Sequence, residues 1–235
     1  YNDTVSTIMA IFWLLVYILI NLTSIIYLGS LAVTAITGIP FGWCVVGLAL
    51  FATVVTLGGM KVIGYTDVFQ VLVLIVGGLV TVYLGLKMVA AHFGYGSNIL
   101  KGFMILTDKV PSHFHMIFKR TNPYYKDLPG LSRRIGGMWI NNLNYWGCNQ
   151  YITQRALGAD LKTARKGILF AAFLKLLTPV IAVLPGIIVY ALYQQGMFRS
   201  QMAGAGGTVA PDHAYPTLLN LLPEGLKGLA FAALT

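Results

Sequence analysis

The sequence predicts an all-α integral membrane protein, and three observations support this fold class. Hydrophobic residues make up 57% of the 235 residues and charged residues only 10%, whereas soluble domains carry about 25% charged residues. The mean hydropathy is +0.75. No acidic or basic residue lies between Asp3 and Lys61, a stretch long enough for two membrane spans of about 20 residues each.

Six membrane spans are predicted along the chain. Gly38-Ile39-Pro40 marks the turn between the first two. All six should be α-helical, because only a helix satisfies its backbone hydrogen bonds within one apolar segment. The predicted spans are 6–34, 41–57, 66–91, 131–157, 167–193 and a last one that begins near Pro216 and is cut off at Thr235, all within a single transmembrane domain over residues 1–235.

The orientation of the spans follows from the short basic loops, because such loops are enriched on the cytoplasmic side. The loop 158–166 carries three basic residues and is placed in the cytoplasm, and Lys61 falls on the same side. The polar stretch 94–130 then becomes a long extracellular loop. It is basic as well, but long connections cross membranes largely regardless of their charge.

The fourth span is interrupted by polar residues. Residues 136–150 contain four asparagines, one glutamine and three glycines. Each unpaired amide in hydrocarbon costs several kcal/mol, about the cost of an unsatisfied hydrogen-bonding group in an apolar solvent. This broken helix must therefore face a polar cavity, a partner helix or a bound solute, which predicts a protein that handles something polar inside the membrane.

Lys175 and Asn142 are predicted to meet near the middle of the bilayer. Lys175 lies nine residues beyond Lys166, about 14 Å along a helix, and a lysine at that depth by default faces a cavity. Asn142 lies seven residues beyond Ile135 on the preceding, antiparallel span, about 10 Å in. The alternative for the lysine is snorkelling towards water along an apolar face.

Asn142, Tyr145 and Asn149 follow an i, i+3, i+7 spacing and would share one face of a continuous helix. Discontinuous helices with polar groups at mid-membrane are how secondary transporters build solute sites. The amide and ammonium could hydrogen-bond a neutral polyhydroxylated solute that stacks against Tyr145 and Trp146. The alternative is hydrogen bonding between helices, which we favour for Asn141 and Asn144 but not for Asn142.

Two other polar residues lie in or beside apolar segments. Asn21 is interpreted as a contact between helices, with the Tyr145 hydroxyl as a candidate partner. Asp67 leaves two interpretations open. Asp67-Val68-Phe69-Gln70 resembles a capping box at the start of the third span, and a carboxylate could equally attract a cation leaving through the inner mouth of a pathway.

Other classes of function find no support in the sequence. The net charge of +9 comes from loop cations, which set topology and meet anionic lipid headgroups, so no nucleic-acid partner is predicted. No nucleophile–base pair, phosphate loop or hydrolytic carboxylate pair is visible, so the chain is not predicted to be an enzyme and needs no cofactor. His113 and His115 lack a third ligand, and Cys44 and Cys148 read as small core residues.

Several of these motifs also resemble a known family. The residues are Trp139-x-x-Asn142-x-x-Tyr145-Trp146-Gly147-x-Asn149-Gln150-x-x-x-Gln154-Arg155, Phe173-Leu174-Lys175-Leu176, Leu184-Pro185-Gly186, Asn21-Leu22-Thr23-Ser24 and Thr66-Asp67-Val68-x-Gln70. Because these motifs are spread along the sequence, essentially the whole chain resembles the sodium/solute symporters. It looks closest to their bacterial sodium/galactose (glucose) branch. The Asn142 and Lys175 combination is what suggests sugar.

The resemblance implies part of a transporter core of two inverted five-helix repeats. If the roles of the matching family residues apply to this chain, Asn142 and Lys175 would hydrogen-bond sugar hydroxyls. Tyr145 would be an inner gate stacked under the sugar and held by Asn21. Asp67 would help sodium leave. Sugar-transporting relatives are expected to have an aromatic residue where Asn144 stands. No complete sodium site is expected, because the chain reads as an internal piece of a longer transporter.

The resulting hypothesis is sodium-coupled symport of a neutral hexose, galactose or glucose, by alternating access across the cell (inner) membrane. The partners implied are sodium, the sugar and membrane lipids, with a homo-oligomer left open. The nearest alternative is a sodium symporter for an inositol, a sialic acid or an amino acid. An alternative of another class is a channel or a membrane subunit of a larger complex.

Overall fold

The computed structural model describes residues 2–115, 117–122, 125–126, 130–203, 210–225 and 227. Over these residues the regular structure consists of helices without a β-strand element, which confirms the predicted all-α fold. The chain divides into two compact units. The first unit joins Tyr1–Gly102 to Val180–Thr235, and the second is Phe103–Pro179.

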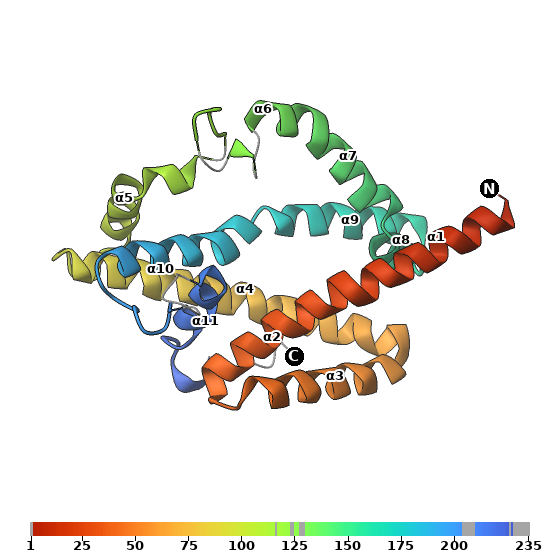
Figure 1. Cartoon of the computed structure of the whole chain (residues 1–235), viewed down its shortest axis with the longest axis horizontal. Coiled ribbons are helices and arrows are strands. Elements are labelled where there is room, and N and C mark those ends of the chain that lie inside the picture. The colour runs from red at the N-terminus through yellow and green to blue at the C-terminus, as the bar shows by residue number, and fades with distance from the viewer. Residues whose placement is uncertain are drawn as a thin grey trace. The chain divides into compact units, whose positions relative to one another are not determined.

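The first unit begins with an almost unbroken helix from Asp3 to Thr37, in which one π-helical turn separates two α-helices. Its helices α4, α10 and α11 contact one another, and α11 also contacts α2 (Figure 1). The elements are α1 (Asp3–Val16), η1 (Tyr17–Leu22), α2 (Thr23–Thr37), α3 (Phe41–Leu57), α4 (Gly59–His92), α10 (Leu184–Gln194), η8 (Pro211–His213) and α11 (Ala214–Leu219).

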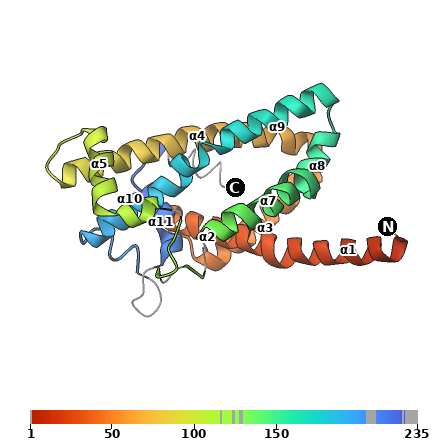
Figure 2. The same cartoon turned by 90° about the horizontal axis from the view of Figure 1, so that it is seen from above.

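The second unit is built from shorter pieces. Helix α8 joins the α7 segment to α9, which runs back in the opposite direction (Figure 2). The elements are α5 (Ile99–Lys109, which starts at the end of the first unit), η2 (Pro111–Phe114), α6 (Gly130–Ser132), η4 (Arg133–Gly137), α7 (Met138–Leu143), η5 (Asn144–Cys148), α8 (Gln150–Leu157) and α9 (Leu161–Lys175), with η6 (Pro179–Val183) at the boundary between the units.

Three helices are long and apolar enough to cross a membrane: Asp3–Thr37, Ile63–His92 and Leu161–Gln194. A fourth apolar helix, Phe41–Leu57, is shorter. These correspond to four of the six predicted spans. The predicted broken span is the succession of short helices from α6 to α8. Of the last predicted span the structure describes α11, while its end lies outside the described residues.

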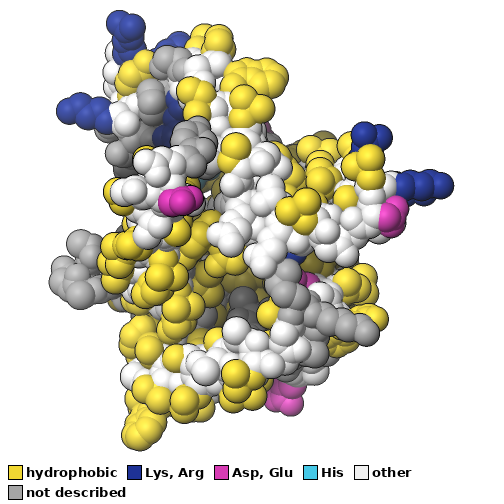
Figure 3. All heavy atoms as spheres, turned by 90° about the vertical axis from the view of Figure 1, so that its right-hand side faces the viewer, with side chains coloured by type: hydrophobic (Ala, Val, Ile, Leu, Met, Phe, Trp, Pro, Cys, Tyr) yellow, Lys and Arg dark blue, Asp and Glu magenta, His cyan; other side chains and the backbone are white. Residues whose placement is uncertain are grey.

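The surface of the chain is apolar over wide areas. Helix α1 buries none of its residues, and large apolar side chains are exposed along it. Figure 3 shows hydrophobic side chains in broad patches on one face, with the Lys and Arg side chains gathered in a few places. Such a surface suits contact with lipid or with further membrane helices, because it has little to offer water.

Two helices begin earlier than their hydrophobic stretches do. Helix α9 starts at Leu161 rather than near residue 167, because the Asp160 carboxylate caps it by accepting a hydrogen bond from the Thr163 N–H (3.1 Å). The hydrogen bonds from Thr163 also lower the pKa of Asp160. Helix α4 starts at Gly59 rather than near residue 66. Hydrophobicity marks the membrane-crossing part of a helix, and polar helical turns can extend beyond it.

The stretch 94–130 is not simply a loop. It contains α5 and the short 3-10 helix η2, and it buries Leu106 and Val110. Gly102 lies so close to the Leu86 carbonyl oxygen that an added Cβ would overlap it. The helix is amphipathic, and its apolar positions were hidden in the overall polar composition of the longer stretch.

Glycines on α4 let the helix pack closely against the segment that follows Pro179. Gly78 faces the side chain of Ile181 and Gly85 faces that of Ile188. Small residues at helix contacts in membrane proteins allow backbones to approach. The neighbouring Gly77 has nothing within 4 Å of the position where a Cβ would lie.

We therefore expect Gly78→Ala to lower the melting temperature of the full-length protein by a few degrees. The new Cβ would lie 2.7 Å from the Ile181 Cβ, and overpacking of this kind costs about 1–3 kcal/mol. Gly77→Ala is the matched control, and it should leave the melting temperature unchanged or raise it, because alanine favours a helix. Thermal unfolding followed by size-exclusion chromatography would check this; equal shifts in both variants would contradict the packing.

Candidate functional site

The polar segment of the second unit forms a helix with a wide turn and then a break. Helix α7 continues into the π-helical turn η5, and Asn149 then adopts an extended conformation (φ −74°, ψ 122°). The side chain of Asn149 caps α8 by accepting a hydrogen bond from the Tyr151 N–H at 2.9 Å. An asparagine at this position satisfies a backbone donor that the new helix leaves unpaired.

Because of this break, Asn142 and Tyr145 can share one helical face, but Asn149 cannot belong to it. Asn142 and Tyr145 lie on continuous helical backbone, since Asn144 between them is helical (φ −62°, ψ −47°). They are three residues apart and therefore neighbours on one face. Asn149 leaves that face, because the extended backbone redirects the chain before α8 begins. The condition of a continuous helix therefore fails between Asn142 and Asn149, which do not share a face, and Asn149 is a helix cap.

Lys175 is the last residue of α9 and reaches the aromatic part of this segment. Its Nζ lies 3.7 Å from the ring centroid of Tyr145 and 5.3 Å from that of Trp146. The two rings meet edge to face, with centroids 5.4 Å apart and an interplanar angle of 85°. The ammonium therefore sits in a corner made by two aromatic rings, an arrangement worth about 0.5–1 kcal/mol when exposed and about 2 kcal/mol when desolvated.

Asn142 is oriented by its own helix. Its Nδ2 donates a hydrogen bond to the Met138 carbonyl at 2.9 Å, and its side chain is exposed. This bond fixes the amide plane and leaves the Oδ1 without a partner among the described residues. No hydrogen bond joins Asn142 to Lys175, so the two are related through Tyr145, which neighbours one and contacts the other. Asn141 and Asn144 are exposed as well.

The remaining predicted site residues lie in the first unit. Asn21 is half-buried within the π-helical turn η1. Tyr145 belongs to the second unit, and the expected hydrogen bond between Asn21 and Tyr145 stays a prediction. Asp67 is half-buried eight residues beyond Gly59, inside α4. The capping-box interpretation was therefore wrong, because the helix already begins at Gly59; the sodium-pathway interpretation remains open.

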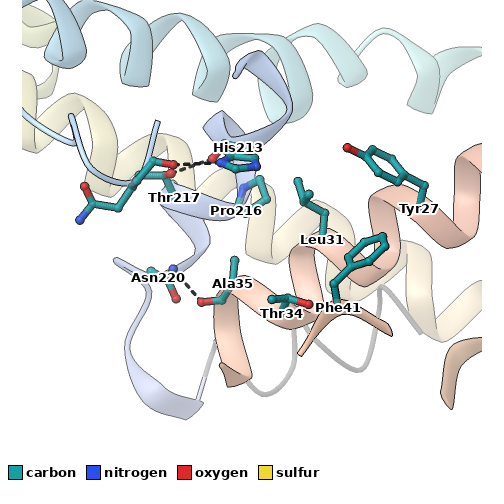
Figure 4. A pocket seen from close by; sticks show the side chains of 10 residues that line it. Tyr27, Leu31, Thr34, Ala35, Phe41, His213, Pro216, Thr217 and Asn220 are labelled. Atoms are coloured by element: carbon teal, nitrogen blue, oxygen red, sulfur yellow. Dashed lines mark hydrogen bonds between the residues drawn. The ribbon is translucent and has the colours of Figure 1, made fainter. Parts of the chain in front are cut away.

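Sequence reasoning missed a cavity of about 550 Å³ in the first unit. Tyr27 and Phe41 stand edge to face on one side, and on the other the Asn220 Nδ2 donates to the Ala35 carbonyl at 3.1 Å (Figure 4). His213 also lines it. The one signal in the sequence was the turn Gly38-Ile39-Pro40, where Gly38 has a φ of 73° and brings α3 back beside α2. None of the predicted site residues lies in this cavity.

The described residues contain no group of three or more His, Cys, Asp or Glu side chains that could hold a metal ion. Cys44 is buried and Cys148 exposed, and both are free thiols. The chemistry available at Lys175 is therefore binding chemistry: a cation, two aromatic faces and an amide oxygen.

A helical membrane protein that gathers amide, ammonium and aromatic groups beside a helix break has the construction of a secondary transporter. The sequence comparison identifies the particular kind. The chain belongs to the sodium:solute symporter family, whose sequence model matches residues 1–235. The expectation that the chain is not an enzyme agrees with membership of a family of symporters.

Curated relatives match most or all of the chain. A sodium/glucose cotransporter of Vibrio parahaemolyticus is 44% identical over 241 residues, which cover 100% of this chain and 44% of that protein. Sodium/myo-inositol cotransporter 2 of Homo sapiens is 30% identical, covering 98% of this chain and 36% of that protein. An uncharacterized symporter of Escherichia coli is 33% identical over 76% of this chain and 28% of its own length. The chain thus spans less than half the length of these relatives.

Proposed function

We propose that the full-length protein carries a neutral hexose, galactose or glucose, across the cell (inner) membrane together with sodium, by alternating access. The observation that carries this proposal is the placement of the Lys175 ammonium over Tyr145, which shares a helical face with Asn142. An ammonium donates hydrogen bonds, an amide oxygen accepts them, and an aromatic ring stacks against the apolar face of a sugar. Small-molecule sites typically place a small number of well-oriented polar groups beside aromatic walls.

In this proposal each side chain has a separate role. Asn142 and Lys175 hydrogen-bond the sugar hydroxyls, and Tyr145 is an inner gate on which the sugar ring stacks. Asn21 holds Tyr145 through its hydroxyl, and Trp146 stands beside Tyr145 as a further gate residue. Asp67 lies on the path by which sodium leaves.

Sodium is proposed as the coupling ion on the strength of the family and of the names of its members. The sugar is proposed because the relative with 44% identity is a sodium/glucose cotransporter. The second candidate solute is an inositol, which the 30% identity to a sodium/myo-inositol cotransporter favours. Inositol is also a neutral polyol, so the same amide and ammonium could serve it. A channel or a complex subunit finds no comparable relative among these matches.

The first expected result is sodium-dependent uptake. Proteoliposomes with the full-length protein should accumulate labelled galactose several-fold faster under an inward sodium gradient than under a potassium gradient. The physical reason is that a symporter can work against a solute gradient only by using that of the ion. Initial uptake rates would be measured in both gradients; equal rates would contradict sodium coupling.

Competition identifies the solute class in the same assay. Unlabelled glucose and galactose should suppress uptake at lower concentration than myo-inositol, and a sialic acid or an amino acid should have little effect. A carboxylated solute that competes best would make Lys175 its charge partner and would replace the hexose in this proposal. Empty liposomes are the background control.

A further inference from the structure

The ammonium of Lys175 and a stacked sugar would need the same place. The Nζ lies 3.7 Å from the centroid of the Tyr145 ring, which is the distance of a group in van der Waals contact with the ring face. A sugar ring that stacks on that face requires the space the ammonium occupies. The Tyr145 side chain is 40% exposed, so its surface is accessible once the ammonium has moved.

Trp146 contributes to holding the ammonium in this place. Its ring stands at 85° to that of Tyr145 and its centroid is 5.3 Å from the Lys175 Nζ. Both rings therefore present electron-rich surface to one cation, which strengthens the attraction over that of a single ring. No carboxylate among the described residues forms an ion pair with Lys175, so its charge is held by the two aromatic rings.

We infer that Lys175 is a displaceable occupant of the sugar site, held over Tyr145 by Trp146 while the site is empty and drawn off the rings when a sugar binds. This inference rests on the proposed function and adds a role to it: Trp146 is a positioning residue that acts on Lys175 rather than on the sugar. In the empty site the Lys175 ammonium covers the Tyr145 ring. When a sugar stacks on that ring, the same ammonium hydrogen-bonds the sugar hydroxyls. An empty carrier thereby keeps its aromatic face covered.

The inference predicts the sign of a double-mutant cycle. Trp146→Leu should tighten galactose binding by the full-length protein about two- to fivefold, because the sugar then displaces a more weakly held ammonium. In a Lys175→Gln background, which keeps a hydrogen-bond donor without the charge, the same Trp146→Leu change should alter the dissociation constant less than twofold. Binding would be measured by equilibrium titration in sodium, in detergent or nanodiscs.

Trp139→Leu is the matched control. Trp139 lies on the same helical segment and is 69% exposed, and it has no recorded contact with Lys175. Its replacement should leave the dissociation constant unchanged in both backgrounds. If Trp146→Leu weakens binding equally with Lys175 and with Gln at position 175, Trp146 contacts the sugar or only supports the fold, and the inference is overturned. Trp146→Phe, a smaller change, should give an intermediate effect.

A second measurement needs no sugar and separates the two proposals. A water-soluble acylating reagent would label the Lys175 amine of the sugar-free protein, with the extent read from its peptide by mass spectrometry. Labelling should rise about two- to fivefold in Trp146→Leu and stay at the wild-type level in Trp139→Leu. A protein that binds no hexose but shows this pattern would refute the proposed function and keep the aromatic hold on Lys175. Unchanged labelling in Trp146→Leu would refute that hold.

Discussion

Replacing Lys175 with alanine is expected to lower sodium-driven galactose uptake by the full-length protein about 10- to 100-fold. The change removes the cation that lies over Tyr145 and with it the charge-assisted hydrogen bonds proposed for the sugar. Such bonds are worth about 1.5–3 kcal/mol, and each 1.4 kcal/mol is a factor of about ten in affinity. Initial uptake rates, corrected for the amount of protein in the membrane, would measure the loss.

Lys162→Ala is the control for this prediction. Lys162 is an exposed residue in the first turn of the same helix α9, far from Tyr145, and its loss should change the rate less than twofold. Lys175→Arg should retain part of the activity, because a guanidinium keeps the charge and the donors but not the compact shape of an ammonium. Equal losses in Lys175→Ala and Lys162→Ala would show that Lys175 has no special part in transport.

Much of the fold could be predicted because a membrane imposes simple rules on a sequence. The helices Asp3–Thr37, Ile63–His92 and Leu161–Gln194 appear as long apolar stretches with few charged residues, and no other regular structure satisfies its own backbone there. Lys175 could be singled out by depth alone, since it is a charge within an apolar helix. Lys175 lies close to Tyr145 because the turn between α8 and α9 is short, so that α9 runs back beside the segment that contains Tyr145.

The details of the break could not be predicted in the same way. The polar residues of segment 136–150 indicated an interruption, but a π-helical turn and an extended residue are both compatible with them. Which residue leaves the helix depends on small differences in backbone hydrogen bonding. Asn149 was the available signal, because asparagine before Gln150 is a good helix cap, yet its spacing from Asn142 suggested a binding face instead.

Asp67 shows a different limit. Its sequence fits a capping box, and Gly58 and Gly59 before it look like a place where a helix stops. The structure instead starts α4 at Gly59 without a side-chain cap. A helix as long as α4 has many turns to stabilise it and does not need a favourable first turn, so local capping signals are weak evidence for its boundary.

Replacing Asn142 with alanine is expected to lower galactose uptake about 3- to 10-fold, whereas Asn141→Ala should change it less than twofold. The two asparagines are adjacent, of one type, and both exposed on α7, so their difference isolates position on the helix. Asn142 shares a face with Tyr145 and holds its amide against the Met138 carbonyl, 2.9 Å away. Its Oδ1 is thereby directed outward as a fixed acceptor for a hydroxyl, and the loss of one such hydrogen bond costs about 0.5–1.5 kcal/mol.

Kinetics can separate binding from structure in this pair. Loss of a bond to the sugar should raise the galactose concentration needed for half-maximal uptake in Asn142→Ala, with little change in the amount of folded protein. Asn142→Asp keeps an acceptor but loses the Nδ2 donor that bonds the Met138 carbonyl, so it should recover only a small part of the affinity. Adjacent helix residues point in directions about 100° apart, so only one of the two asparagines can face the solute. If Asn141→Ala matches Asn142→Ala in uptake rate and in half-saturating concentration, Asn142 does not contact the solute.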